Sequence, residues 1–298
     1  MEVSVIVPTY GRPDRLAACL RALGAQEGVP CEVVVVDDGS EPPVRDVVAQ
    51  AQAQAQAQNG AEAQPAVPMR YLRQANAGPA SARNRGAGAA RGALLAFTDD
   101  DCRPEPGWLA ALLAASRAAP DALLGGHTVN GLPGNVYAAA SQDLIGFLEA
   151  EDRTYFASNN LACRADRFAA SGGFEESFPL AGGEDREFGL RWGGQGRPLV
   201  HVPDAVVHHH HGLTARTFWR QHANYGRGAR HLRARGGEGQ GAAPAHRFGS
   251  LLWYGRLVSY PLRTGQPRGL RRAGLLAAAQ LATAWGFATP PRAGRGAP

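Results

Sequence analysis

The chain has 298 residues, of which 44% are hydrophobic, and this suits one large α/β domain or a domain with an appendage. It shows no run of 18 apolar residues, no signal peptide and no cysteine spacing typical of a zinc site or a disulfide framework, so we predict a cytoplasmic protein. Residues 1–211 hold 17 Arg and 25 acidic residues, whereas residues 212–298 hold 14 Arg and one acid. The basic part suits an anionic partner: a lipid surface, a nucleic acid or a phosphorylated acceptor.

The N-terminal residues predict a strand–helix–strand unit. Residues 3–8 form an apolar run of the kind found in buried parallel strands. Residues 13–23 place their apolar side chains on one helical face, with Pro13 in the first turn. Residues 32–36 form a second apolar run that ends in acids. This order predicts a parallel sheet.

The next part of the chain continues this alternation. We expect strands at residues 69–72 and 93–97, separated by a helix of small residues over 79–91. The repeated Gln-Ala segment, residues 49–58, is either a surface insertion or an extension of a helix. Beyond residue 121 we expect glycine-rich loops between short apolar pieces at residues 123–129, 156–163, 199–202 and 205–207, with helices at 184–192 and from 214 onward.

Acidic residues follow two of the predicted strands. Asp37 and Asp38 follow one, and Asp99, Asp100 and Asp101 follow another. Open α/β sheets bind ligands at the carboxyl ends of their strands. Adjacent carboxylates repel one another unless a cation neutralises them, and in an extended segment Asp99 and Asp101 point the same way. The triplet is either a solvated acidic turn or a site for Mg²⁺ or Mn²⁺, and its position after a buried strand favours the metal.

Four motifs follow one another along the chain: Val7-Pro8-Thr9-Tyr10-Gly11-Arg12, Val35-Val36-Asp37-Asp38-Gly39-Ser40, Asn76-Ala77-Gly78-Pro79-Ala80-Ser81-Ala82-Arg83-Asn84 and Phe97-Thr98-Asp99-Asp100-Asp101. In this order they resemble glycosyltransferase family 2, whose members have the GT-A fold and transfer sugars with inversion. The resemblance covers roughly residues 1–211 and extends weakly to about residue 230.

The resemblance implies a site for a nucleotide-sugar donor. Asp37 would hydrogen-bond the nucleobase, and Arg83 would approach the diphosphate or the base; the other reading of Arg83 is a surface ion pair with an acid such as Asp38. Asp101 would bind the metal, and Asp99 is a second candidate for a metal ligand. Asp99 or Asp100 would face the ribose of the donor. The third acid leaves the assignment within the triplet open. The remaining donor-binding candidates are Pro8, Thr9, Tyr10, Arg12 and Asp38, of which Thr9 and Tyr10 would line the base pocket.

The resemblance also implies a catalytic base separate from the metal site. Asp185 matches the family's position, and Glu184 is its neighbour. Acids at a helix start are commonly plain caps, which is the alternative. An inverting transfer needs a carboxylate that takes the proton from the acceptor hydroxyl.

Further candidates lie after the acidic triplet. Asn159 and Asn160 would contact the acceptor sugar or close a turn, and Trp192 would pack under the sugar or in the core. The resemblance also implies a histidine after the last strand that completes the metal site, and within the run of four histidines His209 is our first choice and His211 our second. The alternative is an accidental run with one packed imidazole.

Together these patterns predict a GT-A, Rossmann-like, mostly parallel α/β sheet flanked by helices. We expect a catalytic domain at 1–211, a basic amphipathic helical extension at 212–288 and a disordered tail at 289–298. The predicted function is transfer of a sugar, with a UDP-sugar favoured, to a hydroxyl of a glycan or lipid-linked acceptor. A nucleotidyltransferase and a sugar-nucleotide-binding protein without catalysis are the alternatives. Aromatic residues among the arginines of 214–235 favour a peripheral site on the inner membrane face over nucleic acid.

Overall fold

The computed structural model describes residues 1–58, 66–151, 155–178, 182–235 and 250–289. Within them an eight-stranded sheet runs in the order β3-β2-β1-β4-β7-β6-β8-β5. The pairs from β3 to β4 are parallel, as is β6 with β8, and the other pairs are antiparallel. The strands are β1 (Val3–Thr9), β2 (Cys31–Asp37), β3 (Met69–Arg73), β4 (Leu94–Phe97), β5 (Cys102–Pro104), β6 (Leu123–Asn130), β7 (Leu161–Arg164) and β8 (Leu199–His209).

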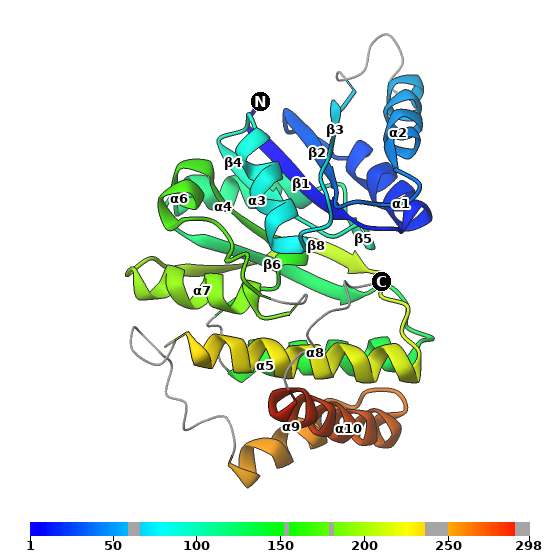
Figure 1. The fold of residues 1–298 in the computed structure, drawn as a ribbon, viewed down its shortest axis with the longest axis vertical. Coiled ribbons are helices and arrows are strands. Elements are labelled where there is room, and N and C mark those ends of the chain that lie inside the picture. The colour runs from blue at the N-terminus through cyan, green and yellow to red at the C-terminus, as the bar shows by residue number, and fades with distance from the viewer. Residues whose placement is uncertain (59–65, 152–154, 179–181, 236–249, 290–298) are drawn as a thin grey trace.

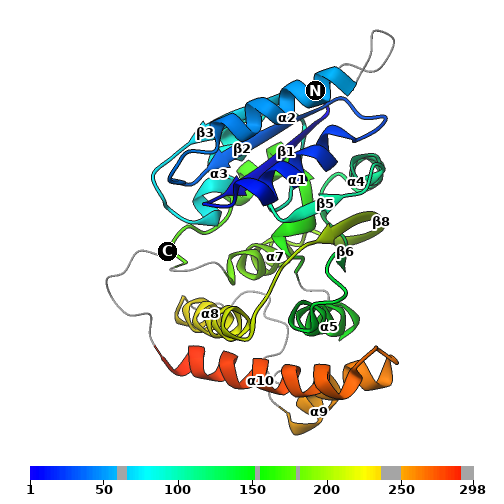
Figure 2. The ribbon, with the colours of Figure 1, turned by 90° about the vertical axis from the view of Figure 1, so that its right-hand side faces the viewer.

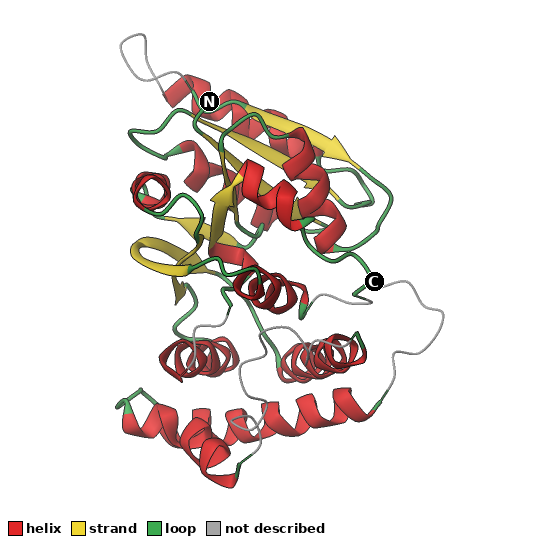
Figure 3. Ribbon diagram, turned by 90° about the vertical axis from the view of Figure 1, so that its left-hand side faces the viewer, coloured by secondary structure: helices red, strands yellow, loops and turns green. Residues whose placement is uncertain are grey.

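Helices cover both faces of the sheet (Figure 3). They are α1 (Pro13–Gly24), α2 (Arg45–Gln58), α3 (Pro79–Ala89), α4 (Trp108–Ala118), α5 (Val136–Glu151), α6 (Ala165–Ser171), α7 (Glu184–Gly194), α8 (Ala215–Ala234), α9 (Leu251–Arg263) and α10 (Gly269–Ala288), with a 3-10 turn at Ser158–Asn160.

The alternation of β1 side chains divides the core into two layers. Val5 and its alternate neighbours pack with α1, α2 and α4, whereas Ile6 faces α3, α6 and α7. Successive side chains of a strand point to opposite faces, so a strand buried on both sides needs apolar residues almost throughout. The apolar runs at residues 3–8 and 32–36 therefore predict strands, and the predicted strand–helix–strand unit is confirmed.

The second half of the chain departs from several expectations. The apolar piece at residues 156–163 contains the 3-10 turn and the start of β7. The pieces at 199–202 and 205–207 belong to the single strand β8, interrupted in its burial by the exposed Pro203 and Asp204. The whole Gln-Ala segment, residues 49–58, belongs to α2, which confirms the prediction of a helix extension. The prediction of a disordered tail falls, from residue 290 onward, outside the described residues.

A helical layer formed by α5, α8, α9 and α10 lies beside the sheet (Figures 1 and 2). Helix α5 precedes residue 212 in sequence, yet it packs against α9 and α10. The buried guanidinium of Arg272 in α10 donates from Nε to Asp143 Oδ2 of α5 at 2.6 Å. The basic C-terminal helices therefore share a packed layer with a helix of the N-terminal part. None of the helices in the described ranges is long and apolar enough to cross a membrane.

Glycines allow α8 and α10 to cross closely, and this gives a stability prediction. A methyl group on Gly286 would overlap the carbonyl oxygen of Ala223, whereas Gly274 in the same helix has open space. We expect Gly286→Ala to lower the free energy of unfolding by about 1–3 kcal/mol. The control Gly274→Ala should raise it by roughly 0.5–1 kcal/mol through helix propensity. Thermal unfolding of both variants measures this, and equal stability would mean that the helices do not cross at Gly286.

Candidate functional site

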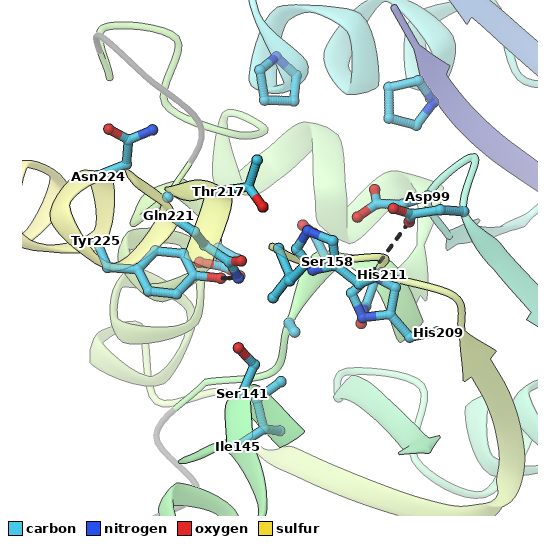
Figure 4. A pocket seen from close by; sticks show the side chains of 18 of the residues that line it. Asp99, Ser141, Ile145, Ser158, His209, His211, Thr217, Gln221, Asn224 and Tyr225 are labelled. Atoms are coloured by element: carbon cyan, nitrogen blue, oxygen red, sulfur yellow. Dashed lines mark hydrogen bonds and ion pairs between the residues drawn. The ribbon is translucent and has the colours of Figure 1, made fainter. Parts of the chain in front are cut away.

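A cavity of about 450 Å³ lies between the carboxyl ends of β1 and β4 and the helices α5 and α8. Figure 4 shows its two sides: Asp99 and His209 on the sheet side, and side chains of α5 and α8 opposite them. Its lining residues are Pro8, Thr9, Tyr10, Arg12, Asp38, Pro79, Arg83, Asp99, Asp101, Asn130, Ala138, Ser141, Gln142, Ile145, Ala157, Ser158, Asn159, Gly182, Glu184, Asp185, His209, His211, Leu213, Thr217, Arg220, Gln221, Asn224 and Tyr225.

The loop after β1 lines the cavity, as expected for donor-binding candidates. Thr9 Oγ1 donates to Asp100 Oδ2 at 2.7 Å, so the end of β1 is tied to the acidic triplet. Tyr10 keeps about a third of its surface exposed beside the cavity. Asp38 also lines it and accepts hydrogen bonds from the backbone of Ala77 and Gly78 at 2.8 and 2.9 Å. The loop after β2 thereby holds the start of α3.

The structure does not place Asp37 in the cavity, which corrects its expected contact with a nucleobase. Its side chain is fully buried and accepts hydrogen bonds from the backbone N–H groups of Ser40 and Val44 and from the Tyr71 hydroxyl, 2.6 Å away. Burial opposes its ionisation, but these bonds outweigh burial and lower the pKa of Asp37. Asp37 shapes the loop, and Asp38 is the acid that reaches the cavity wall.

The acidic triplet forms a turn, so its three carboxylates diverge instead of alternating along an extended segment. Asp99 faces Arg83, and Asp101 faces His209. Asp100 is fully buried, does not line the cavity, and lies 3.0 Å from the guanidinium of Arg12. Burial raises the pKa of Asp100 to about 7. This corrects the expectation that Asp100 contacts the donor, because it anchors the Thr9 and Arg12 loop.

Asp101 and His209 form the centre of a candidate metal site. Asp101 Oδ1 lies 3.3 Å from His209 Nε2. Burial opposes ionisation of Asp101, but the bond to His209 and the charge of Arg12 outweigh burial and lower the pKa of Asp101. The ligand atoms of Asp101, Cys102 and His209 all lie within 4.8 Å of one another. Burial raises the pKa of the Cys102 thiol well above its ordinary value.

The histidine run divides by strand register. β8 continues through His209 and, since side chains alternate, His208 turns to Glu105 at 2.9 Å while His209 turns to Asp101. His211 also lines the cavity, with its ring centroid 4.9 Å from that of His209. Burial lowers the pKa of His211 to about 4, so its imidazole is neutral. The contact between its imidazole and the Asp101 carboxylate distinguishes His209 from the other histidines of the run.

Arg83 links the triplet to α7. Its side chain is 4% exposed and reaches Asp99 Oδ1 at 2.7 Å and Glu184 Oε1 at 3.2 Å. The alternative of a surface ion pair with Asp38 is therefore wrong. Arg83 connects the acid expected near the ribose with the acids at the start of α7.

Glu184 and Asp185 begin α7 and both line the cavity. The sharp turn before them uses Gly182 and Gly183, whose positive φ angles of 127° and 110° favour glycine. Glu184 Oε2 accepts from the Gly182 N–H at 2.8 Å, so Glu184 holds the turn that precedes α7. Burial, followed by the charge of Glu184, raises the pKa of Asp185 to about 7. The two acids thus differ in environment, as a structural acid and a base would.

Two acceptor-binding candidates are corrected. Trp192 is fully buried and packs against Phe188, 5.5 Å away between ring centroids, because this face of α7 covers the sheet. Asn160 is buried as well: its Oδ1 accepts from Trp108 Nε1 at 2.8 Å, and its Nδ2 donates to the carbonyl of Ala205. Neither reaches the cavity. Asn159 does line it, with Nδ2 3.4 Å from His209 Nδ1.

The motifs in the sequence did not predict the side of the cavity that α5 and α8 form. Ser141, Ile145, Gln221 and Tyr225 point into it (Figure 4). α5 is alanine-rich with a weak apolar stripe, so its sequence carried little signal. In α8, the polar residues at positions 217, 220, 221, 224 and 225 recur with helical spacing. That spacing was the one available indication of a second polar face.

The model of the family described as glycosyl transferase family 2 matches residues 4–172. The chain belongs to glycosyltransferase family 2. It is 29% identical over 248 residues to the pre-mycofactocin glycosyltransferase of Mycobacterium tuberculosis, covering 78% of this chain and 48% of that protein. It is 30% identical over 234 residues to the validoxylamine A glucosyltransferase of Streptomyces hygroscopicus, covering 66% and 49%. The chain thus spans about half the length of these relatives.

A solved structure supports the fold. The mannosyltransferase of Pyrobaculum calidifontis, in complex with GDP-mannose and Mn²⁺, superposes with a TM-score of 0.65 at 19% identity, covering 95% of this chain and 87% of that one. The predicted GT-A fold with its helical extension is therefore confirmed. Family membership supports sugar transfer as the activity.

Proposed function

We propose that this chain is an inverting, metal-dependent glycosyltransferase that moves a sugar from a nucleoside-diphosphate donor, with a UDP-sugar favoured, to a hydroxyl of a glycan or lipid-linked acceptor. The observation that carries the proposal is the arrangement of Asp185: a carboxyl with a raised pKa lines the same cavity as the Asp101–His209 pair and is separate from it. Family membership favours this reading over a nucleotidyltransferase or a binding protein without catalysis.

The residues at the metal site fit a divalent cation, Mn²⁺ or Mg²⁺. A carboxylate and an imidazole nitrogen lie close enough to bind one ion, and the triplet concentrates negative charge beside them. We propose that Asp101 and His209 hold the ion, with Asp99 or His211 next to it. When bound, the ion neutralises charge on the departing diphosphate. The contacts with His209 and Arg12 favour the ionised form of Asp101.

The donor and the base have separate places in the cavity. We propose that the nucleotide lies along Pro8, Thr9, Tyr10, Arg12 and Asp38, with Arg83 near the diphosphate. Asp185 then takes the proton from the acceptor hydroxyl as that oxygen attacks the anomeric carbon. Asn159 lines the cavity beside His209 and can bond a sugar hydroxyl.

The stereochemistry of donor hydrolysis tests the proposal even when the acceptor is not known, because a water molecule can attack the donor in place of the acceptor. UDP-, GDP- and dTDP-linked α-glucose and α-mannose are each incubated with the protein and Mn²⁺. Proton NMR at early times identifies the anomer that is released. We expect the β-anomer from the preferred donor, and release of the α-anomer would contradict inversion.

The raised pKa of Asp185 gives a prediction for pH dependence. A base must be deprotonated, so kcat/KM should fall as the pH drops below about 7, the pKa of Asp185. Burial is the main cause of this raised pKa, and the charge of Glu184 is the next. Glu184→Gln removes that charge, so we expect the acidic limb to move to lower pH. An unchanged midpoint in Glu184→Gln would show that another group limits the rate.

We further propose that the C-terminal helices rest peripherally on the inner face of a membrane, as part of a basic extension that follows a catalytic domain ending near residue 211. Leu270, Leu281 and Trp285 are 81%, 66% and 58% exposed, and their spacing places them on one side of α10. Arg268 and Arg271 lie beside Leu270 in the sequence. Exposed apolar side chains among arginines suit an anionic lipid surface. Co-sedimentation with vesicles that contain phosphatidylglycerol, and none with neutral vesicles, is the expected result.

A further inference from the structure

The helices α5 and α8 form a polar wall of the cavity that none of the donor or metal residues occupies. We name it the helical wall. It consists of Ser141, Gln142 and Ile145 of α5 and of Thr217, Arg220, Gln221, Asn224 and Tyr225 of α8. Figure 4 shows Ser141, Gln221 and Tyr225 facing the space that separates them from Asp99. Its position opposite the acids leaves it free to bind a second substrate.

Two buried polar atoms of the helical wall lack partners. Ser141 Oγ and Gln221 Oε1 are buried, and neither has a hydrogen-bond partner within the described residues. Gln221 Nε2 donates to the Tyr225 hydroxyl at 2.6 Å, which fixes the amide and leaves its carbonyl oxygen for another donor. A buried polar atom without a partner is costly. These atoms therefore suit the hydroxyl groups of a bound ligand, with the Tyr225 ring beside them.

Arg220 provides the charge of the helical wall. The cavity contains two other arginines, and both are engaged: Arg12 with Asp100 and Asp101, and Arg83 with Asp99 and Glu184. Arg220, by contrast, makes no ion pair or hydrogen bond in the ranges that the structure describes. A planar guanidinium with several free donors matches a phosphate group especially well.

We infer that the helical wall binds the acceptor and that this acceptor carries a phosphate group, held by Arg220. The inference rests on the proposed function, because it assumes that the opposite side of the cavity holds the donor. Hydroxyl groups beside the phosphate meet Ser141 and Gln221. The phosphate can belong to a lipid-linked acceptor or to a water-soluble sugar phosphate, and both present the same group to Arg220.

The test measures phosphate binding while the donor side is filled. Wild type, Arg220→Gln and the control Arg216→Gln are saturated with nucleoside diphosphate and Mn²⁺, then titrated by calorimetry with decyl phosphate or glucose 1-phosphate. Arg216 lies one turn before Arg220, is exposed and does not line the cavity. We expect Arg220→Gln to weaken phosphate binding roughly tenfold or more, whereas Arg216→Gln binds like wild type. Tighter binding of decyl phosphate supports the lipid source, and tighter binding of glucose 1-phosphate supports the soluble one.

Two results would overturn the inference. One is equal phosphate binding by Arg220→Gln and wild type. The other is a loss of nucleotide binding in Arg220→Gln with phosphate binding unchanged, which would move Arg220 to the donor. The phosphate titrations are also repeated without nucleotide. If the protein binds no nucleotide, the proposed function is contradicted, but these titrations still measure whether Arg220 binds phosphate.

Discussion

Asp185→Asn is expected to reduce sugar transfer by about 10²- to 10⁴-fold, the usual contribution of a positioned general base. The amide has nearly the same shape, and its oxygen can still accept the 2.8 Å hydrogen bond from the Arg186 N–H. It cannot take a proton from an attacking hydroxyl. Donor binding precedes that step, so the dissociation constant of the nucleotide should stay within about twofold of wild type. Donor hydrolysis and nucleotide calorimetry measure the two effects separately.

Asp14→Asn is the matched control for this variant. Asp14 is also an acid in the first turn of a helix, but it is exposed and does not line the cavity. It should leave both hydrolysis and nucleotide binding unchanged. A parallel loss of hydrolysis and nucleotide binding in Asp185→Asn would assign Asp185 to the donor site rather than to proton transfer.

Loss of the metal ligands should have the second large effect. We expect His209→Ala and Asp101→Asn each to weaken Mn²⁺-dependent nucleotide binding by at least about tenfold, because even residues behind the ligands usually cost 10- to 100-fold in metal affinity. His208→Ala is the control, since His208 is the preceding residue of β8 but faces Glu105. Calorimetry with and without Mn²⁺ reports the change. Equal affinity in His209→Ala and His208→Ala would place the metal elsewhere.

The parallel half of the fold was predictable because its sequence is locally consistent. Strands such as Val3–Thr9 are buried on both faces and are therefore apolar almost throughout. The acids that follow these strands could also be predicted to share one site, because the carboxyl ends of parallel strands meet at one edge of the sheet. Residue spacing could not distinguish a catalytic base from an ordinary helix cap at Asp185. Only the family resemblance favours the base, and this role of Asp185 stays a prediction.

Packing decided what the sequence left ambiguous. Trp192 and Phe188 are four residues apart in α7 and share the face that covers the sheet. Trp192, which the sequence placed either under a sugar or in the core, is therefore a core residue. Asn160 satisfies buried groups of distant elements, which no local pattern reveals. The helical wall combines α5 with α8, and both helices pack against α10 through contacts between residues that lie far apart in sequence, such as Asp143 of α5 and Arg272 of α10.

Calorimetric titration with UDP, GDP and dTDP, in Mn²⁺ and then in EDTA, tests the central claim most directly. The cavity is proposed to hold a nucleoside diphosphate against the Asp101–His209 pair. We therefore expect one of the three, with UDP favoured, to bind in Mn²⁺ and to lose most of its affinity in EDTA. A folded protein that binds none of them under either condition would contradict the account.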